Sequence, residues 1–202
     1  MVNVDSSISN LNRYLKKPIT IDKLDQALNQ MGFELDDPSP NALRIDITAD
    51  RPDMVSTAGI ARVLNAFLGE AIGFPKIEKK KSTFDLIVDK SVGGVRPYTV
   101  AMVVKNIALT QEKLDELIWV QEKIHATFAR ERKKAAIGIY PLKKIHWPIT
   151  FMAQPPEKIS FPPLGSEKAM SGREILNEHP TGKKYAHLLE EMPSFPVFRD
   201  SV

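Results

Sequence analysis

The spacing of apolar residues along the chain predicts a mixture of α and β structure. Residues 21–31 and 60–68 carry apolar side chains three and four positions apart, the spacing that places them on one face of a helix. Residues 43–48 instead alternate apolar and polar side chains, as half-buried strands do. Because the strand-like residues 33–37 precede them across a turn-forming segment, the two stretches predict a β-hairpin. We therefore expect a small α+β domain at the N-terminus.

A longer helix is predicted from Thr110, whose hydroxyl is suited to cap the first turn. Several apolar side chains fall on one stripe of this helix and favour packing against a core. They are Leu114, Leu117, Ile118, Ile124 and Phe128. Gln121 and His125 lie on the same stripe. Because an unpaired buried polar group costs on the order of 1–3 kcal/mol, both side chains are expected to have hydrogen-bond partners. Most buried polar groups of this kind are satisfied core residues, and the alternative is that the pair lines a binding site.

A basic cluster follows the helix and consists of Arg130, Arg132, Lys133 and Lys134. Positive charges at the C-terminal end of a helix offset the negative end of its dipole, so one role is that of a cap. The other is a patch that contacts the phosphates of a nucleic acid. The apolar residues 135–140 then predict a strand, in which Gly138 indicates either a bulge or a close approach by a ligand or by backbone.

A second domain is predicted after a lysine-rich connector. Residues 74–82 have no apolar period and are typical of a linker. Residues 84–90 and 98–107 are apolar, β-branched stretches that predict two strands. A strand at 146–156 and a short helix at 171–177 follow. The expected division is an α+β domain in residues 1–75, a linker in 76–82 and a mixed-sheet domain in 83–202.

Composition and charge limit the chemistry that this chain can carry. The 202 residues include no cysteine, which excludes disulfides and thiolate sites, and the four histidines are scattered, so we expect no bound metal. No apolar run approaches the roughly 20 residues that cross a bilayer, and a signal-peptide pattern is missing, so we expect a cytoplasmic protein that avoids membranes. Residues 1–75 carry 7 basic and 10 acidic side chains, whereas residues 76–202 carry 21 and 15. Only the second part therefore favours a polyanionic partner.

The most specific motif lies between Thr48 and Gly69 and reads T-x-x-R-P-D-x-x-S-x-x-G-I-A-R-x-L-x-x-x-L-G. It resembles the N-terminal region of the β subunit of phenylalanyl-tRNA synthetases, with Asp50 where the family usually has asparagine. The resemblance to the archaeal and eukaryotic branch continues along the rest of the chain. It is carried by R-P-Y at 96–98, Q-E-K-I-H at 121–125, the basic cluster, I-G-I-Y at 137–140, F-x-P-L-G at 161–165 and G-x-x-Y-x-H-L at 182–188. The departures are Ala129, Glu131, Pro141 and Lys143.

This resemblance implies both a fold and a function. The fold would be a small N-terminal α+β domain followed by the first part of a mixed-sheet editing domain of the B3/B4 type, whose second half is expected beyond Val202. The implied enzyme is an α2β2 phenylalanine–tRNA ligase, in which the α subunit uses ATP and Mg²⁺ to charge tRNA(Phe). The β subunit would contribute tRNA binding and the hydrolysis of mischarged Tyr-tRNA(Phe). Such editing is needed because a pocket shaped for an apolar ring rejects an added hydroxyl only weakly.

The resemblance also implies roles for particular residues. Gln121 and His125 would form one wall of the editing site, and the basic cluster would contact RNA. The chain itself is expected to bind no cofactor, to hold no catalytic residue and to be inactive in isolation. Two alternatives remain, a free-standing deacylase of mischarged tRNA and a non-catalytic module that binds RNA or a protein partner.

Overall fold

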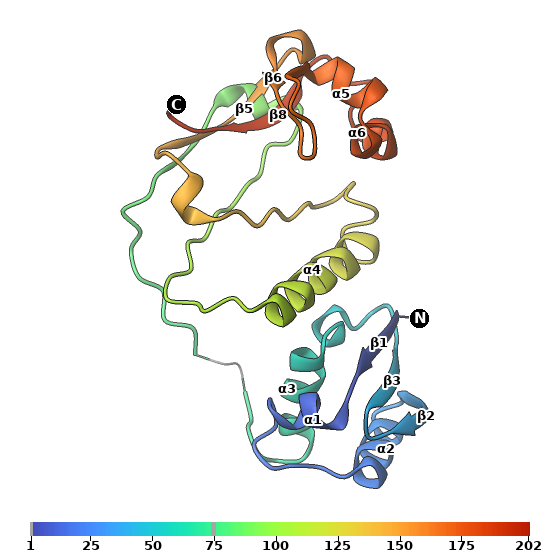
Figure 1. The fold of residues 1–202 in the computed structure, drawn as a ribbon. Helices are drawn as coiled ribbons and strands as arrows, with labels where there is room; N and C mark the ends of the chain where they lie inside the picture. The colour runs from blue at the N-terminus through green and yellow to red at the C-terminus, as the bar shows by residue number, and fades with distance from the viewer. Residues whose placement is uncertain (1, 74–75) are drawn as a thin grey trace. The chain divides into compact units, whose positions relative to one another are not determined.

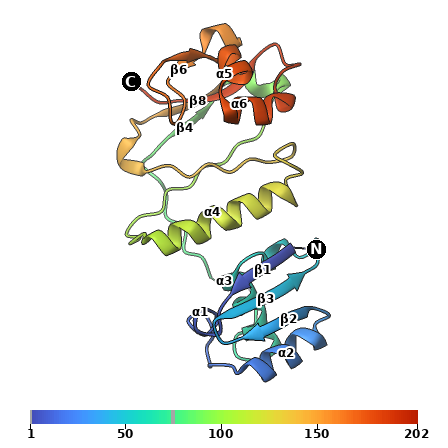
Figure 2. The same ribbon diagram turned by 45° about the vertical axis from the view of Figure 1, so that its right-hand side comes forward.

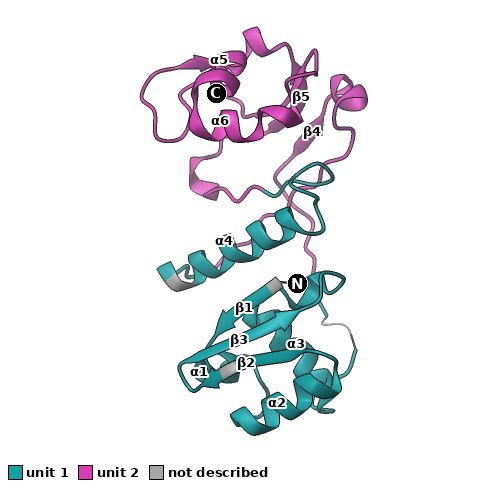
Figure 3. Ribbon diagram, turned by 90° about the vertical axis from the view of Figure 1, so that its right-hand side faces the viewer, with its two compact units in different colours: residues 1–78, 108–137 teal, residues 79–107, 138–202 magenta. Residues whose placement is uncertain are grey.

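The structure, a computed structural model, describes residues 2–73 and 76–202. The chain divides into two compact units, residues 1–78 with 108–137 and residues 79–107 with 138–202 (Figure 3). The first break falls inside the connector predicted at 76–82, while Phe74 and Pro75 lie outside the described residues. Residues 108–137 group with the N-terminal residues because of the contacts they make. The contiguous division into 1–75 and 83–202 stays a prediction.

The first unit is built on a three-stranded antiparallel sheet (Figures 1 and 2). Its strands are β1 (Val2–Ser6), β2 (Glu34–Ser39) and β3 (Ala42–Ile47), in the order β1-β3-β2. Leu43, Ile45 and Ile47 of β3 are buried, and the residues between them are more exposed. The predicted hairpin and its alternating pattern are therefore confirmed.

Three capped helices of this unit supply the rest of its core. They are α1 (Ile8–Asn12), α2 (Ile21–Gln30) and α3 (Thr57–Phe67). The side chains of Ser7, Thr20 and Ser56 each accept a backbone N–H at the helix start, which satisfies a donor that has no partner within the helix. The apolar faces of the helices meet β3 in one core of buried residues. These include Leu11, Leu24, Leu28, Ile45, Ile60 and Leu64.

The motif around Arg51 joins β3 to α3 through a single 3-10 turn, Pro52–Met54. The Arg51 guanidinium donates two hydrogen bonds to the Asp53 carboxylate, at 2.9 and 2.8 Å, and holds the pKa of that carboxyl below its ordinary value. The Gly59 N–H donates to Ser56 Oγ at 3.0 Å. A Cβ on Gly59 would overlap the carbonyl oxygen of Asp53, so this position accepts only glycine without a backbone shift. The spacing of the motif thus reflects local packing of the turn against α3.

The second unit contains a mixed sheet of β4 (Leu86–Val88), β5 (Ile149–Gln154) and β8 (Phe195–Arg199). β4 runs parallel to β5, and β8 runs antiparallel to it, with the rings of Phe151 and Phe198 stacked at 4.5 Å between centroids. A small antiparallel pair, β6 (Ser160–Phe161) and β7 (Met170–Ser171), precedes α5 (Gly172–Glu178) and α6 (Pro180–Tyr185). Ser171 and Glu174 form a capping box at the start of α5, and the short helix predicted at 171–177 is confirmed. The α+β class and the mixed sheet are confirmed.

Two predicted strands are wrong. Residues 98–107 and 135–140, all of them described, are not strands. An extended segment becomes a strand only where a neighbouring chain completes its backbone hydrogen bonds, and neither segment is paired in one of the sheets. Most apolar side chains of 98–107 consequently stay in solvent, and Val100 is 96% exposed.

The expected packing of the long helix is also wrong. α4 (Gln111–Ala126) begins where predicted, because Thr110 Oγ1 accepts the Lys113 N–H at 3.3 Å. Leu117 and Ile118, however, are exposed along its apolar stripe. Periodicity identifies the face of a helix that is suited to burial and does not by itself supply a covering partner.

We predict that Gly59→Ala destabilises the first unit by about 1–3 kcal/mol, because the new methyl group must displace the Asp53 carbonyl. Urea denaturation followed by circular dichroism measures this loss. Gly94→Ala is the matched control, since a Cβ there meets no atom within 4 Å. Equal denaturation midpoints for the two variants would contradict the packing argument.

Candidate functional site

The chain leaves α4 through a tight left-handed turn. Arg130, Glu131 and Arg132 have φ values of 49°, 52° and 67°. Residues with a Cβ avoid this region, at a cost of roughly 1–2 kcal/mol each, so the surrounding structure must hold the turn in place. Ala129 anchors it: the residue is fully buried, its N–H donates to Ile124 O at 2.9 Å, and its carbonyl accepts the Lys134 N–H at 2.9 Å. The turn is therefore a fixed feature of the backbone.

Gln121 and His125 hold the segment that follows the turn. His125 is 1% exposed, and its Nε2 accepts the N–H of Ile137 at 2.8 Å. Gln121 Nε2 donates to the carbonyl oxygen of the same residue at 2.9 Å. Both main-chain groups of Ile137 are thereby bound to α4. The prediction that these two polar side chains have partners is confirmed.

The contacts of His125 determine its tautomer. Because Nε2 accepts a hydrogen bond, the ring proton lies on Nδ1, which faces Glu122 Oε1 at 3.4 Å. Both ring nitrogens are thus occupied by protein groups. In this arrangement His125 positions backbone and is not available as a general base.

Glu122 joins this arrangement to the basic cluster and was not identified from the sequence pattern. Its Oε1 accepts a hydrogen bond from Arg132 Nη2 at 2.6 Å. Arg132 and, to a smaller extent, His125 lower the pKa of the Glu122 carboxyl below its ordinary value. The signal available in the sequence was its spacing of three residues from His125, which places both side chains on one side of α4.

The basic cluster divides into two kinds of residue. Arg132 is partly buried and tied to Glu122, so it stabilises the turn. Arg130, Lys133 and Lys134 are exposed, and no described carboxylate pairs with any of them. The Lys134 ammonium lies 5.9 Å from the centroid of the Phe128 ring. We call Arg130, Lys133 and Lys134 the exposed cations of the turn.

An open hollow of about 620 Å³ lies beside the turn within the first unit. Its wall combines the exposed side of the turn with residues of the Thr48–Gly69 motif. The lining residues are Ala49, Asp50, Pro52, Ala126, Thr127, Phe128, Arg130 and Lys134. A hydrogen bond from Thr48 is the main cause that lowers the pKa of Asp50, so this carboxylate is charged at neutral pH. The hollow thus presents one anion and two cations.

At Gly138 a bulge or a close approach by a ligand or by backbone was predicted, but residues 135–140 are not a strand and the nearest neighbour is a side chain. A Cβ there would lie 2.6 Å from the ring of Tyr140, two residues along the same segment. Across residues 2–73 and 76–202, no group of three His, Asp or Glu side chains is arranged to hold a metal ion. In the same ranges, no helix has both the length and the apolar character to cross a membrane. The chemistry that the arrangement around α4 offers is anion binding on a rigid turn.

We predict that His125→Ala releases the segment after the turn, because the Ile137 N–H loses its acceptor. The loss should amount to about 1–3 kcal/mol in the free energy that protects this amide. Hydrogen exchange at Ile137, Lys134 and Ala129 measures it. His187→Ala, at an exposed histidine of the second unit, is the control and should leave these amides unchanged.

A second prediction concerns pH. Because the folded state lowers the pKa of Glu122, its carboxylate stabilises the fold above the unfolded-state pKa of about 4.3, and this contribution is lost as pH falls through the folded pKa. Glu122→Gln should therefore be less stable than the native protein at neutral pH, and the difference should shrink below about pH 4. Urea midpoints across this range test it, with Glu178→Gln, an exposed site outside the turn, as control. A difference that is independent of pH would exclude the ion pair as its cause.

Comparison with known proteins agrees with the motifs. No protein-family profile matches the sequence. The phenylalanine–tRNA ligase beta subunit of Methanocella arvoryzae is 33% identical over 201 residues, which cover 99% of this chain and 36% of the relative. That of Thermococcus onnurineus is 38% identical over 207 residues, covering all of this chain and 36% of the relative. The chain thus spans about a third of the length of these relatives.

The fold gives the same result. A crystal structure of an N-terminal fragment of the phenylalanyl-tRNA synthetase beta subunit from Pyrococcus horikoshii matches with a TM-score of 0.88 and 34% identity. The match covers 98% of this chain and 58% of that fragment. Sequence and fold together therefore confirm the resemblance: over nearly its whole length this chain is similar to archaeal phenylalanine–tRNA ligase beta subunits and, in fold, to an N-terminal fragment of one of them.

Proposed function

We propose that the chain acts as the N-terminal part of a phenylalanine–tRNA ligase β subunit, in assembly with the α subunit, and that it contributes to binding tRNA(Phe) and to editing. The support is the similarity to ligase β subunits over nearly all of this chain. In the proposed α2β2 assembly, charging with ATP and Mg²⁺ takes place on other parts of the enzyme. The chain alone is proposed to have no ligase activity.

The observation that carries the RNA role is the set of exposed cations on a rigid turn. Arg130, Lys133 and Lys134 sit on backbone that Ala129 and the Glu122–Arg132 pair keep in one conformation. Residues 130–134 carry four basic side chains and one acidic side chain, Glu131. Since the turn is already ordered, phosphate binding carries no entropy cost for ordering the backbone. Fixed cations without carboxylate partners favour a phosphate backbone as ligand.

For editing, we propose that residues 83–202 are the first part of a B3/B4-type domain and that Gln121 and His125 support one wall of its site. Gln121 uses its amide nitrogen for Ile137, and its Oε1 accepts no hydrogen bond from the described residues. This oxygen is available to a substrate donor such as a hydroxyl. His125 lies behind it as a positioning residue, because it is buried and fully engaged. The hydrolysis of Tyr-tRNA(Phe) would require further groups of the complete subunit.

The three exposed cations and Arg132 should respond differently to substitution. Replacing Arg130, Lys133 and Lys134 together by alanine should flatten the slope of log affinity for tRNA against log salt by about two to three units, a little under one for each lost phosphate contact. Arg132→Ala should mainly destabilise the turn, because Arg132 is paired with Glu122. Filter binding between low and moderate salt, starting in the range of about 10⁻⁴–10⁻⁶ M, measures the slope.

The matched control replaces Lys79, Lys80 and Lys81, three exposed lysines of the second unit, by alanine. This variant changes the net charge by the same amount and should keep the native slope. If it flattens the slope as much as the turn variant does, the binding reflects total charge and the turn has no special role. An unchanged slope in a folded turn variant would assign the cluster to helix capping.

A further inference from the structure

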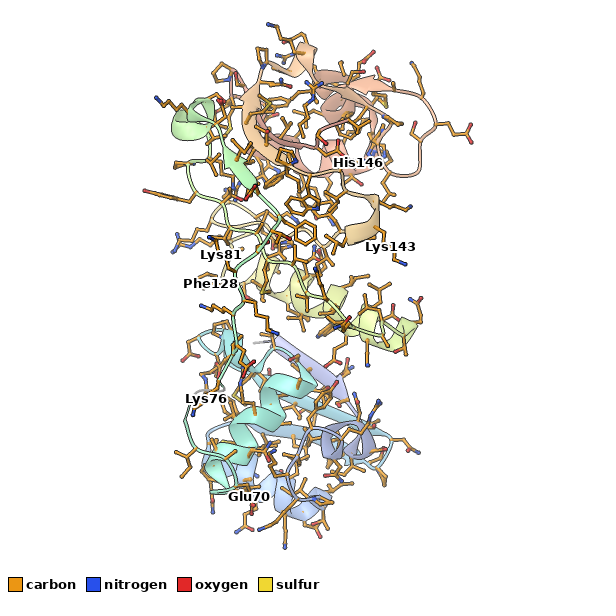
Figure 4. All side chains as sticks on the ribbon, turned by 90° about the vertical axis from the view of Figure 1, so that its left-hand side faces the viewer. Glu70, Lys76, Lys81, Phe128, Lys143 and His146 are labelled. Carbon is orange, nitrogen blue, oxygen red and sulfur yellow. The ribbon has the colours of Figure 1, made fainter. Side chains whose placement is uncertain are left out.

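Phe128 is an exposed aromatic residue at the edge of the basic turn. It follows the last residues of α4 and is labelled in Figure 4. The residue is 61% exposed. The residues on either side of it are fixed: the Thr127 N–H donates to Lys123 O at 3.0 Å, and the Ala129 N–H donates to Ile124 O at 2.9 Å. A large apolar ring is therefore held in solvent by an ordered backbone. Its exposure leaves an aromatic face that a ligand can contact, and covering this face with a planar partner would be favourable.

The surroundings of the ring combine the features of protein sites that bind single-stranded nucleic acids. Phe128, Arg130 and Lys134 line the same hollow, and Lys134 already lies over the face of the ring at 5.9 Å from its centroid. Protein sites that bind unpaired RNA have an aromatic ring that stacks on a base and, beside it, cations that contact the adjoining phosphates. We propose that Phe128 is a stacking platform for one unpaired RNA base, with the neighbouring phosphates on Arg130 and Lys134. This inference rests on the proposed RNA-binding function of the turn and specifies its ligand as single-stranded.

The rest of the hollow sets the orientation of the nucleotide. Asp50 contributes a charged carboxylate, which repels phosphate and accepts hydrogen bonds. The groups of a nucleotide that can donate to it are the exocyclic amine of the base and the ribose hydroxyls. Pro52 and Ala49 offer apolar surface beside it. The nucleotide therefore has its phosphates at the cationic side and its base edge or sugar at Asp50.

Phe128→Leu tests the platform, because leucine keeps an apolar side chain and removes the aromatic face. The probes are a short oligoadenylate, an abasic ribose-phosphate chain of equal length and an RNA duplex. The native protein should bind the oligoadenylate about 5- to 150-fold more tightly than the abasic chain, the range that one stacked base supplies. The leucine variant should lose most of this preference while keeping the salt slope. Phe67→Leu, at a phenylalanine 44% exposed at the end of α3, is the control and should change neither quantity.

The outcomes separate the platform from the proposed function. If Phe128→Leu leaves the preference intact while the turn variant still flattens the salt slope, the platform is wrong and the RNA-binding function stands. If neither variant alters binding, both are wrong. Equal weakening for the abasic chain and the oligoadenylate would show that Phe128 acts through the shape of the turn, which also overturns the platform. Thermal melts of the leucine variant should match those of the native protein, since the side chain is mostly in solvent.

Discussion

Two side chains of α4 bind the main-chain N–H and carbonyl oxygen of Ile137, and the arrangement of the candidate site depends on these two hydrogen bonds. His125 accepts the N–H and Gln121 binds the carbonyl oxygen, so the chain after the turn is returned to the helix that precedes it. Hydrogen bonds at Ala129 before the turn and at Ile137 after it hold the chain on both sides of residues 130–132. These contacts offset the cost of the left-handed backbone at the three residues. The same hydrogen bonds therefore set the positions of the exposed cations and of Phe128.

The basic residues of the turn have different roles. Arg132 forms an ion pair with Glu122, whereas Arg130, Lys133 and Lys134 are exposed to solvent and can contact a ligand. A run of basic residues therefore contains structural and available members side by side. The difference arises from backbone conformation, since the turn places successive side chains in different surroundings.

Local chemistry allowed much of the fold to be predicted. The cap at Thr110 and the hairpin ending at Ile47 depend on neighbouring residues, and they form as expected. The need of Gln121 and His125 for partners also followed from the cost of unpaired polar groups. The identity of those partners did not, because Ile137 is brought back by a turn of non-glycine residues that sequence patterns do not favour. The strands predicted at 98–107 and 135–140 failed because strand formation requires a neighbouring chain that local pattern cannot specify.

The unpaired residues 98–107 have a consequence for the behaviour of the chain in solution. This stretch contains neither proline nor glycine and has a single charged residue, Lys105, while Tyr98, Val100 and Met102 alternate along it in solvent. Apolar alternation with unpaired backbone groups is the pattern by which separate chains associate through intermolecular β-pairing. A higher protein concentration should therefore favour association of chains through these segments.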